Sequence, residues 1–262
     1  MRRDRVFPSG RCDLHISRRA FAGHILSAMA LTAACRLDGE ASPANEGRLA
    51  ARPVKGVKTS AQGTQPLGLD RDRDAILHMP PVAGDGPLPL VVLFHGAGGS
   101  GERLLRRLSA VTDEAGLAVL APDSRESTWD AIGGSFDRDV TFLDRALRRV
   151  FETVAIDPAH VAAAGFSDGA TYALSLGLIN GDLFRRVVAF SPGFIVDGAA
   201  QGKPRIFVSH GTADNILPIN QCSRVIVPAL RRRGYDVTFR EFSGGHEMPP
   251  DVAREGMTSI TS

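Results

Sequence analysis

The chain has 262 residues, of which 43% are hydrophobic and 23% charged, and its formal net charge is +2. This length and composition indicate one folded domain with a sizeable core and exclude an intrinsically disordered protein. Six arginines and two aspartates give residues 1–34 a net charge of +4, which leaves −2 for the remainder. The body of the chain has no excess of positive charge, and this argues against nucleic-acid binding.

The first 34 residues have the pattern of an export signal. Ser17-Arg-Arg-Ala-Phe21 precedes a largely apolar stretch, residues 22–34, that is too short to be a comfortable membrane span. The paired arginines resemble a twin-arginine signal, and Cys35 after Leu-Thr-Ala-Ala resembles the lipidated cysteine of a lipoprotein. We expect export, either as a periplasmic or cell-surface lipoprotein attached to a membrane through Cys35, or as a secreted protein. A basic leader without an export role is the alternative.

Residues 35–68 are rich in Ala, Gly, Pro and polar side chains and lack apolar periodicity, so they are predicted to be a flexible spacer. The folded domain is then residues 69–262. Cys12 would leave with the signal and lipidation would use Cys35, so no two cysteines would remain to form a disulfide. A disulfide framework is therefore excluded.

From residue 69 onward, short apolar runs alternate with amphipathic segments. This alternation predicts βαβ units, and so an α/β fold with a mainly parallel central sheet and helices on both faces. The predicted strands cover residues 75–79, 90–94, 117–121, 160–165, 187–190, 205–209 and 236–240. The predicted helices cover residues 102–115, 139–153, 169–178 and 221–233. In such a sheet, functional residues gather beyond the carboxyl ends of the strands.

The pentapeptide Gly165-Phe-Ser-Asp-Gly169 ends the fourth predicted strand and leads directly into a helix. A serine flanked by glycines at this spacing is typical of a nucleophile elbow, because larger residues there would collide with the packed sheet and helix. The turn lifts the Ser167 hydroxyl above the strand and puts the Asp168 N–H at a helix N-terminus. In a chain with 28 glycines the pattern alone is weak, and an ordinary strand-to-helix turn is the alternative.

A glycine-rich loop, His95-Gly-Ala-Gly-Gly-Ser-Gly101, follows the second predicted strand. Glycines let backbone N–H groups turn inward, as an oxyanion hole requires, and we expect Ala97 and Asp168 to supply the two donors. The loop lacks the Lys-Ser/Thr ending of a Walker phosphate loop. We interpret His95 as a brace for the loop in preference to a base or a metal ligand.

Two further strand ends carry an acid and a histidine. Asp214 lies in His-Gly-Thr-Ala-Asp after the strand at 205–209, where it can orient an imidazole, although an aspartate that caps its own turn is the alternative. His246 lies in Ser-Gly-Gly-His-Glu after the last strand and is the expected general base. The rival residues are the histidines in or at strands and the acid next to His246: His78, His160, His210 and Glu247.

The order Ser167, Asp214, His246, each at a predicted strand end, is that of the α/β-hydrolase triad. Through FHGAGG, GFSDGA, HGTAD and GGHEMPP, residues 70–255 resemble α/β-hydrolase serine esterases. The resemblance is to phospholipase/carboxylesterase-like and to poly(3-hydroxybutyrate) depolymerase-like or feruloyl-esterase-like members. It implies an α/β-hydrolase fold with these three residues as the catalytic triad. The chemistry needs no cofactor, and no zinc-type spacing of ligands is present.

The loops around the predicted site give the candidates for substrate binding. The segment between the strands at 187–190 and 205–209 is too short for the helical lid of lipases, so no large lid is expected. Trp129, Phe194 and Leu217 are the candidate pocket residues, and an aromatic that only pins its loop is the alternative for Trp129. Asp139 and Asp144 are expected on the solvated face of a helix.

The sequence thus predicts an exported serine esterase that hydrolyses small or medium carboxylic esters through an acyl-serine intermediate. Polyester depolymerase, feruloyl esterase and thioesterase are alternatives with the same chemistry. A catalytically inactive surface binding protein on a hydrolase scaffold is the alternative of another class. The expected partner is an ester substrate, either a small molecule or a polymer, and the sequence does not indicate an oligomeric state.

Overall fold

The computed structural model describes residues 46–81 and 86–262. The predicted export signal, residues 1–34, and the predicted lipidation site, Cys35, lie outside the described residues. Within the described ranges, no helix is long and apolar enough to cross a membrane.

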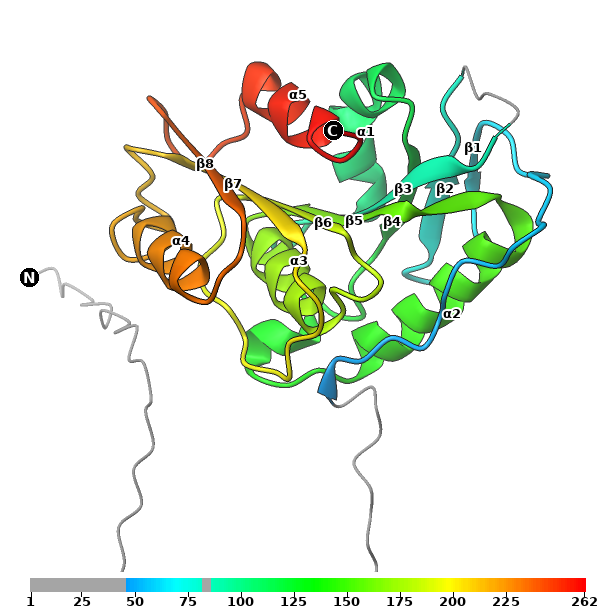
Figure 1. Ribbon diagram of the computed structural model, residues 1–262, viewed down its shortest axis with the longest axis horizontal. Helices are drawn as coiled ribbons and strands as arrows, with labels where there is room; N and C mark the ends of the chain where they lie inside the picture. The colour runs from blue at the N-terminus through cyan, green and yellow to red at the C-terminus, as the bar shows by residue number, and fades with distance from the viewer. Residues whose placement is uncertain (1–45, 82–85) are drawn as a thin grey trace, which may run out of the picture. The chain divides into compact units, whose positions relative to one another are not determined.

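In the described ranges, eight strands form one sheet in the order β1-β2-β4-β3-β5-β6-β7-β8 (Figure 1). The β1–β2 and β2–β4 pairs are antiparallel, and all pairs from β4 to β8 are parallel. This mainly parallel sheet confirms the predicted fold class, and β1 is the one described strand that was not predicted. The strands are β1 (Thr64–Pro66), β2 (Ala75–His78), β3 (Leu88–Phe94), β4 (Ala118–Pro122), β5 (Ile156–Phe166), β6 (Arg186–Phe190), β7 (Arg205–Gly211) and β8 (Val237–Phe242).

Helices cover both faces of the sheet (Figure 1). One face carries α1 (Gly101–Glu114) and α5 (Pro250–Thr258). The other carries α2 (Arg138–Thr153), α3 (Asp168–Ile179) and α4 (Ser223–Arg232), with the short 3-10 helix η2 (Asp130–Gly133) before α2. Helix α5 was not predicted, although Pro250 in its first turn is compatible with a helix start, where no N–H is needed.

The central strands are buried on both faces, which explains their continuous apolar runs. In β3, Leu90 and Val92 belong to the core under α2, whereas Val91 and Leu93 belong to the core under α1 and α5. All four are 0% exposed. The carboxyl ends of these strands are therefore fixed by packing on both faces, and the loops that follow them start from rigid positions.

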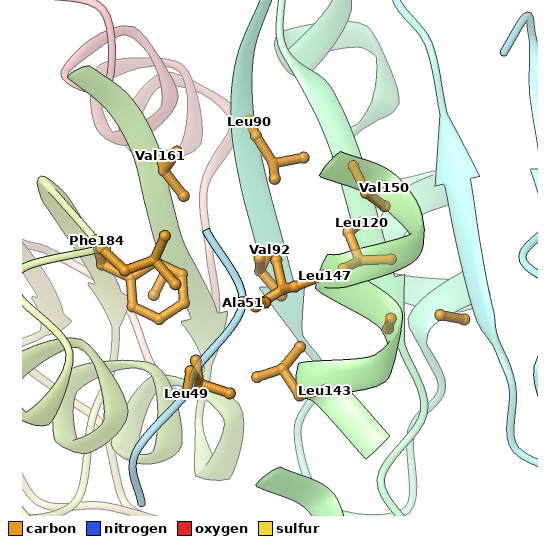
Figure 2. Packing of buried hydrophobic residues seen from close by; sticks show 14 of the residues in the cluster. Leu49, Ala51, Leu90, Val92, Leu120, Leu143, Leu147, Val150, Val161 and Phe184 are labelled. Atoms are coloured by element: carbon orange, nitrogen blue, oxygen red, sulfur yellow. The ribbon is translucent and has the colours of Figure 1, made fainter. Parts of the chain in front are cut away.

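The chain around Leu49 and Ala51 is packed onto the domain, and this corrects the prediction of a flexible spacer for this part of residues 35–68. Leu49 is 2% exposed and Ala51 3%, and both belong to the main hydrophobic core. Figure 2 shows them among side chains of that core, including Leu143, Leu147 and Phe184. The composition of the segment gave no sign that the side chains of Leu49 and Ala51 would be buried.

Polar contacts hold the same segment in place. Asn180, at the end of α3, accepts a hydrogen bond from the Leu49 N–H at 2.9 Å and donates one to the Gly47 carbonyl at 2.7 Å. Arg48 and Arg52 both pair with Asp182. Burial alone would raise the pKa of Asp182, but hydrogen bonds from the two arginines lower it to about 2. We call residues 47–52 the amino-terminal strap.

Asp144 on α2 also serves the strap and is not part of a solvated helix face, as the sequence had suggested. Its carboxylate accepts hydrogen bonds from the backbone N–H groups of Ala50, at 2.6 Å, and Ala51, at 2.7 Å. The side chain also pairs with Arg148 one turn along the helix. The strap is therefore anchored to α2 and α3 together.

Candidate active site

The turn between β5 and α3 holds Ser167 in a strained backbone conformation, with φ 59° and ψ −123°. Such a conformation costs a non-glycine residue about 1–3 kcal/mol and persists only where the surroundings enforce it. The flanking glycines show how it is enforced. A Cβ on Gly165 would collide with the Gly169 carbonyl, and a Cβ on Gly169 would collide with the Phe94 carbonyl. Strand and helix thus approach so closely that only glycine fits at either position.

The three predicted catalytic side chains lie in one hydrogen-bonded series. The Ser167 Oγ lies 2.8 Å from the Nε2 of His246, and the His246 Nδ1 lies 2.7 Å from the Oδ2 of Asp214. They come from the loops after β5, β8 and β7, respectively. Because Asp214 accepts only, Nδ1 carries a proton, and Nε2 is then free to accept the serine proton in the neutral imidazole. This arrangement suits removal of a proton from the serine hydroxyl.

The turn that carries Asp214 points its carboxylate at His246. Its Oδ1 accepts hydrogen bonds from the N–H groups of Ile216, at 2.9 Å, and Leu217, at 2.8 Å. The Asp214 side chain is fully buried. Burial would raise its pKa, but the hydrogen bonds from His246 and from the two backbone N–H groups outweigh burial and hold the pKa below its usual value. Asp214 is therefore a carboxylate at neutral pH.

The two expected oxyanion donors lie on backbone next to the nucleophile. Asp168 is the first residue of α3, where the helix dipole favours negative charge. The glycine-rich loop passes close to Ser167, since a Cβ on Gly96 would lie 3.3 Å from the Ser167 Cβ. In the part of the chain that the structure describes, neither the Ala97 nor the Asp168 N–H has a backbone acceptor. Both groups are available to a ligand.

His95 braces this loop, as the sequence analysis interpreted it. Its Nε2 accepts a hydrogen bond from the Ser124 N–H at 3.0 Å, so Nδ1 carries the proton and donates to the Gly96 carbonyl at 2.8 Å. Burial lowers the pKa of His95, which keeps the ring neutral. The imidazole is 2% exposed and lies outside the Ser167–His246 pair.

A known family and several known proteins match this chain. The phospholipase/carboxylesterase family matches residues 134–261. A putative esterase, NocK of Nocardia uniformis subsp. tsuyamanensis, is 31% identical over 186 residues, which cover 66% of this chain and 53% of that protein. The chain has the α/β-hydrolase fold. Feruloyl esterase C of Emericella nidulans is 26% identical over 186 residues, 64% of this chain and 66% of its own length.

Solved structures show the same fold. The crystal structure of esterase PE8 has a TM-score of 0.57 and 23% identity, and the match covers 71% of this chain and 98% of PE8. The Bacillus cereus carboxylesterase has a TM-score of 0.56 and 19% identity, with 73% of this chain and 95% of that chain covered. By contrast, the chain spans only about half to two thirds of NocK and feruloyl esterase C.

Trp129, which was expected to line the substrate pocket, is buried instead. Trp129 is 2% exposed and packs against the rings of Phe94 and Tyr172, and its Nε1 donates to the His95 carbonyl at 2.8 Å. It therefore supports the glycine-rich loop from below and does not border an open pocket, which corrects the prediction. Its neighbour Thr128, which the sequence analysis did not identify, donates from Oγ1 to the Asp168 Oδ2 at 2.7 Å.

Buried carboxylates hold the segment around Trp129. Asp139 is 2% exposed, which corrects its assignment to a solvated helix face. It accepts hydrogen bonds from the N–H groups of Arg125, at 2.6 Å, and Asp130, at 2.7 Å. Burial nevertheless raises the pKa of Asp139 to about 6. A titrating carboxylate thus fixes the segment that contacts both the glycine-rich loop and Asp168.

The general-base loop has supports that sequence reasoning also missed. The ring of Phe166 lies 4.8 Å from the imidazole of His246, centre to centre. The Arg107 guanidinium lies over Phe166 at 5.6 Å and donates to the Met248 carbonyl at 3.2 Å. The only sequence signal for Phe166 was its position inside the pentapeptide, and Arg107 gave none. Both residues restrict the movement of the imidazole toward α1.

The remaining substrate-binding candidates, Phe194 and Leu217, lie on the segments that follow β6 and β7. Phe194 is 39% exposed, and Leu217 is half-buried with its Cδ atoms close to Gly193. Ile216, which was not predicted, is 65% exposed beside Leu217. Among the described residues, no group of three or more His, Cys, Asp or Glu could hold a metal ion.

Proposed function

We propose that this α/β-hydrolase is a serine esterase that cleaves carboxylic esters through an acyl-serine intermediate. The observation that carries the proposal is the continuous series from the Ser167 Oγ through His246 to Asp214, at 2.8 Å and 2.7 Å. A scaffold that served only for binding would have no need to keep Ser167 in a strained conformation or to bury an ionised Asp214 against an imidazole. The family match and the esterase relatives support the same reaction class.

In the proposed reaction, the Ser167 Oγ attacks the ester carbonyl carbon while His246 Nε2 takes its proton. The carbonyl oxygen becomes an oxyanion and accepts hydrogen bonds from the N–H groups of Ala97 and Asp168. Asp214 stabilises the imidazolium, which then protonates the departing alcohol. Water, activated by His246, attacks the acyl-serine in the second half of the cycle and releases the acid.

Small or medium carboxylic esters are the first candidate substrates, because Phe194 and Ile216 expose apolar side chains on the segments after β6 and β7. Hydroxycinnamoyl esters are the second candidate, favoured by the likeness to feruloyl esterase C. Polyesters and thioesters use the same chemistry but have no observation of their own in favour of them.

The test is labelling of the protein with a fluorophosphonate probe, together with hydrolysis of p-nitrophenyl esters of increasing acyl length and of methyl ferulate. We expect labelling and turnover in the wild type and a loss of at least about 10⁴-fold in kcat for Ser167→Ala. Ser191→Ala is the matched control, since Ser191 also has a positive φ, 53°, but its buried Oγ has no hydrogen-bond partner among the described residues. Labelling that persists in Ser167→Ala would reject the proposal.

We further propose that the protein is exported and attached to a membrane through a lipidated Cys35, with secretion as the alternative. The support is the twin-arginine pattern and the lipobox-like residues before Cys35. Mass spectrometry of the protein made in its natural host tests it. A mature amino terminus at a diacylated Cys35 is expected, and an unprocessed chain would contradict export.

A further inference from the structure

A second histidine, His210, contacts the acid of the triad. It is the next-to-last residue of β7 and is 0% exposed. Its Nε2 lies 2.7 Å from the Leu217 carbonyl oxygen and 3.2 Å from the Asp214 Oδ2. This is the same carboxylate oxygen that lies 2.7 Å from His246. Asp214 therefore faces two imidazoles at one oxygen.

The partners of His210 fix its tautomer. The Leu217 carbonyl and the Asp214 carboxylate accept only, so Nε2 carries the proton and is shared between them. On the other side of the ring, Nδ1 lies 2.6 Å from the Ser223 Oγ, which can donate to it. Burial lowers the pKa of His210 despite the raising effects of the Leu217 carbonyl and Asp214. The ring is thus a neutral donor at physiological pH.

The other charged groups near His210 do not change its role as a neutral donor to Asp214. Glu241 on β8 is the register neighbour of His210, and its carboxylate pairs with Arg224 of α4 at 2.6 Å. The side facing the active site holds Asp214 and His246. The negative charge closest to His210 that is not paired with an arginine is therefore the catalytic carboxylate.

We infer that His210 is a positioning residue of the triad, a neutral donor that fixes the Asp214 Oδ2 toward His246 and competes with His246 for that oxygen. The inference rests on the proposed serine esterase function. Two effects follow. The bond to the Leu217 carbonyl ties the turn 214–217 to the end of β7, and so orients the carboxylate. The bond to Oδ2 reduces the charge that Asp214 offers to the His246 imidazolium.

Removal of the His210 donor is expected to misorient the Asp214 carboxylate and to leave its Oδ2 with His246 as its imidazole partner. For His210→Leu we expect kcat to fall about 10-fold with little change in KM, because a buried hydrogen bond to a charged group is lost. The acid limb of the kcat/KM profile is expected to move to higher pH by roughly half a unit, because an unshared carboxylate holds the proton on His246 more strongly.

A conservative variant separates positioning from mere packing. His210→Gln keeps an amide N–H that can reach the Asp214 Oδ2 and the Leu217 carbonyl, so it is expected to restore most of kcat and the wild-type acid limb. His160→Leu is the matched control, because it removes another His–Asp hydrogen bond, at 2.7 Å to Asp157, in a different part of the sheet. It is expected to leave the pH profile in place.

The experiment measures kcat, KM and the pH profile with a p-nitrophenyl ester for each full-length variant, after titration of the active fraction with a fluorophosphonate. Proton NMR of the downfield His246 Nδ1–H resonance is recorded in parallel, and this readout does not require turnover. A moved resonance and acid limb in His210→Leu, rescued in His210→Gln, support the inference. A loss in kcat that Gln does not rescue, or an unmoved limb and resonance, overturns it. A wild type without turnover contradicts the proposed function instead, while the resonance still decides on His210.

Discussion

The proposed nucleophile, Ser167, and its two partners, Asp214 and His246, are held in place by different means. Ser167 lies on a turn fixed by close backbone packing, and residues 169–179 of α3 are all buried behind it. Asp214 and His246 lie on loops fixed by hydrogen bonds from polar side chains, among them His210 and Arg107. The first region should therefore be sensitive to added volume and insensitive to charge. The second should respond to the loss of a donor or to pH, and it should tolerate added volume only where the chain is open, as at Gly245.

The largest effect is expected from adding one methyl group to the nucleophile turn. Gly169→Ala would press a Cβ against the Phe94 carbonyl, so we expect a loss of about 3 kcal/mol in the free energy of unfolding. A shift of Ser167 by about 1 Å would lower kcat about 100-fold. Urea denaturation and ester hydrolysis measure the two effects.

The matched control lies in the general-base loop. A Cβ on Gly245 meets nothing within 4 Å, so Gly245→Ala should change both quantities little. Equal effects of the two substitutions would remove the contrast between the regions.

An effect of similar size on stability is expected from pH at Asp139, which holds the segment around Trp129 and belongs to neither region. Burial raises the pKa of Asp139 from 3.8 to about 6. The folded protein therefore binds this proton more tightly than the unfolded chain, and the resulting stability is present below about pH 4 and is lost as the pH rises through 6. Relative to Asp139→Asn, the wild type should lose up to about 3 kcal/mol between pH 4 and 7.

Urea denaturation of both proteins across this range checks the prediction. Asp251→Asn, a change at a carboxylate whose side chain is 72% exposed, is the control and should run parallel to the wild type. A constant difference between wild type and Asp139→Asn at all pH values would refute the assignment.

The smallest effect is expected at Arg107. Arg107→Met keeps much of the contact with Phe166 but removes the donor to the Met248 carbonyl, so the loop of His246 should become looser. We expect kcat to fall about 3- to 10-fold with little loss of stability, because a single solvent-accessible hydrogen bond contributes about 1 kcal/mol.

Arg106→Met tests whether the loss of a positive charge on α1 is by itself enough to lower kcat. Arg106 pairs with Glu102 on an exposed surface, and its side chain is 65% exposed. The rates of the two variants with a p-nitrophenyl ester should differ, and indistinguishable rates would show that Arg107 does not support the base.

The sequence allowed prediction of what depends on local pattern. Apolar runs of strand length and helical periodicity predicted seven of the eight strands that the structure describes, and four helices, close to their observed bounds. The positions of Ser167, Asp214 and His246 followed from glycine-flanked motifs at strand ends. At these positions the residues adjacent in the sequence are enough to determine both the local backbone and the place of the side chain in the fold.

The rest depends on contacts between distant segments. Trp129 looked like a pocket residue because it lies on a loop, yet the space under that loop is bounded by Phe94 and Tyr172, which come from elsewhere in the chain. The strap looked like a spacer because its composition is that of one, yet Asn180 and Asp144 supply partners for its backbone. No periodicity in a short segment reveals such partners.

The strap also fixes where the chain joins the domain. Its hydrogen bonds with Asn180 lie at the end of α3, whereas Ser167 lies at the start. A helix of 12 residues is about 18 Å long, so a full helix length separates the point of attachment from the nucleophile. When the protein is immobilised through residues upstream of Gly47, Ser167 should therefore lie a helix length from the point of attachment, and the hydrogen bonds of the strap should resist its detachment from α2 and α3.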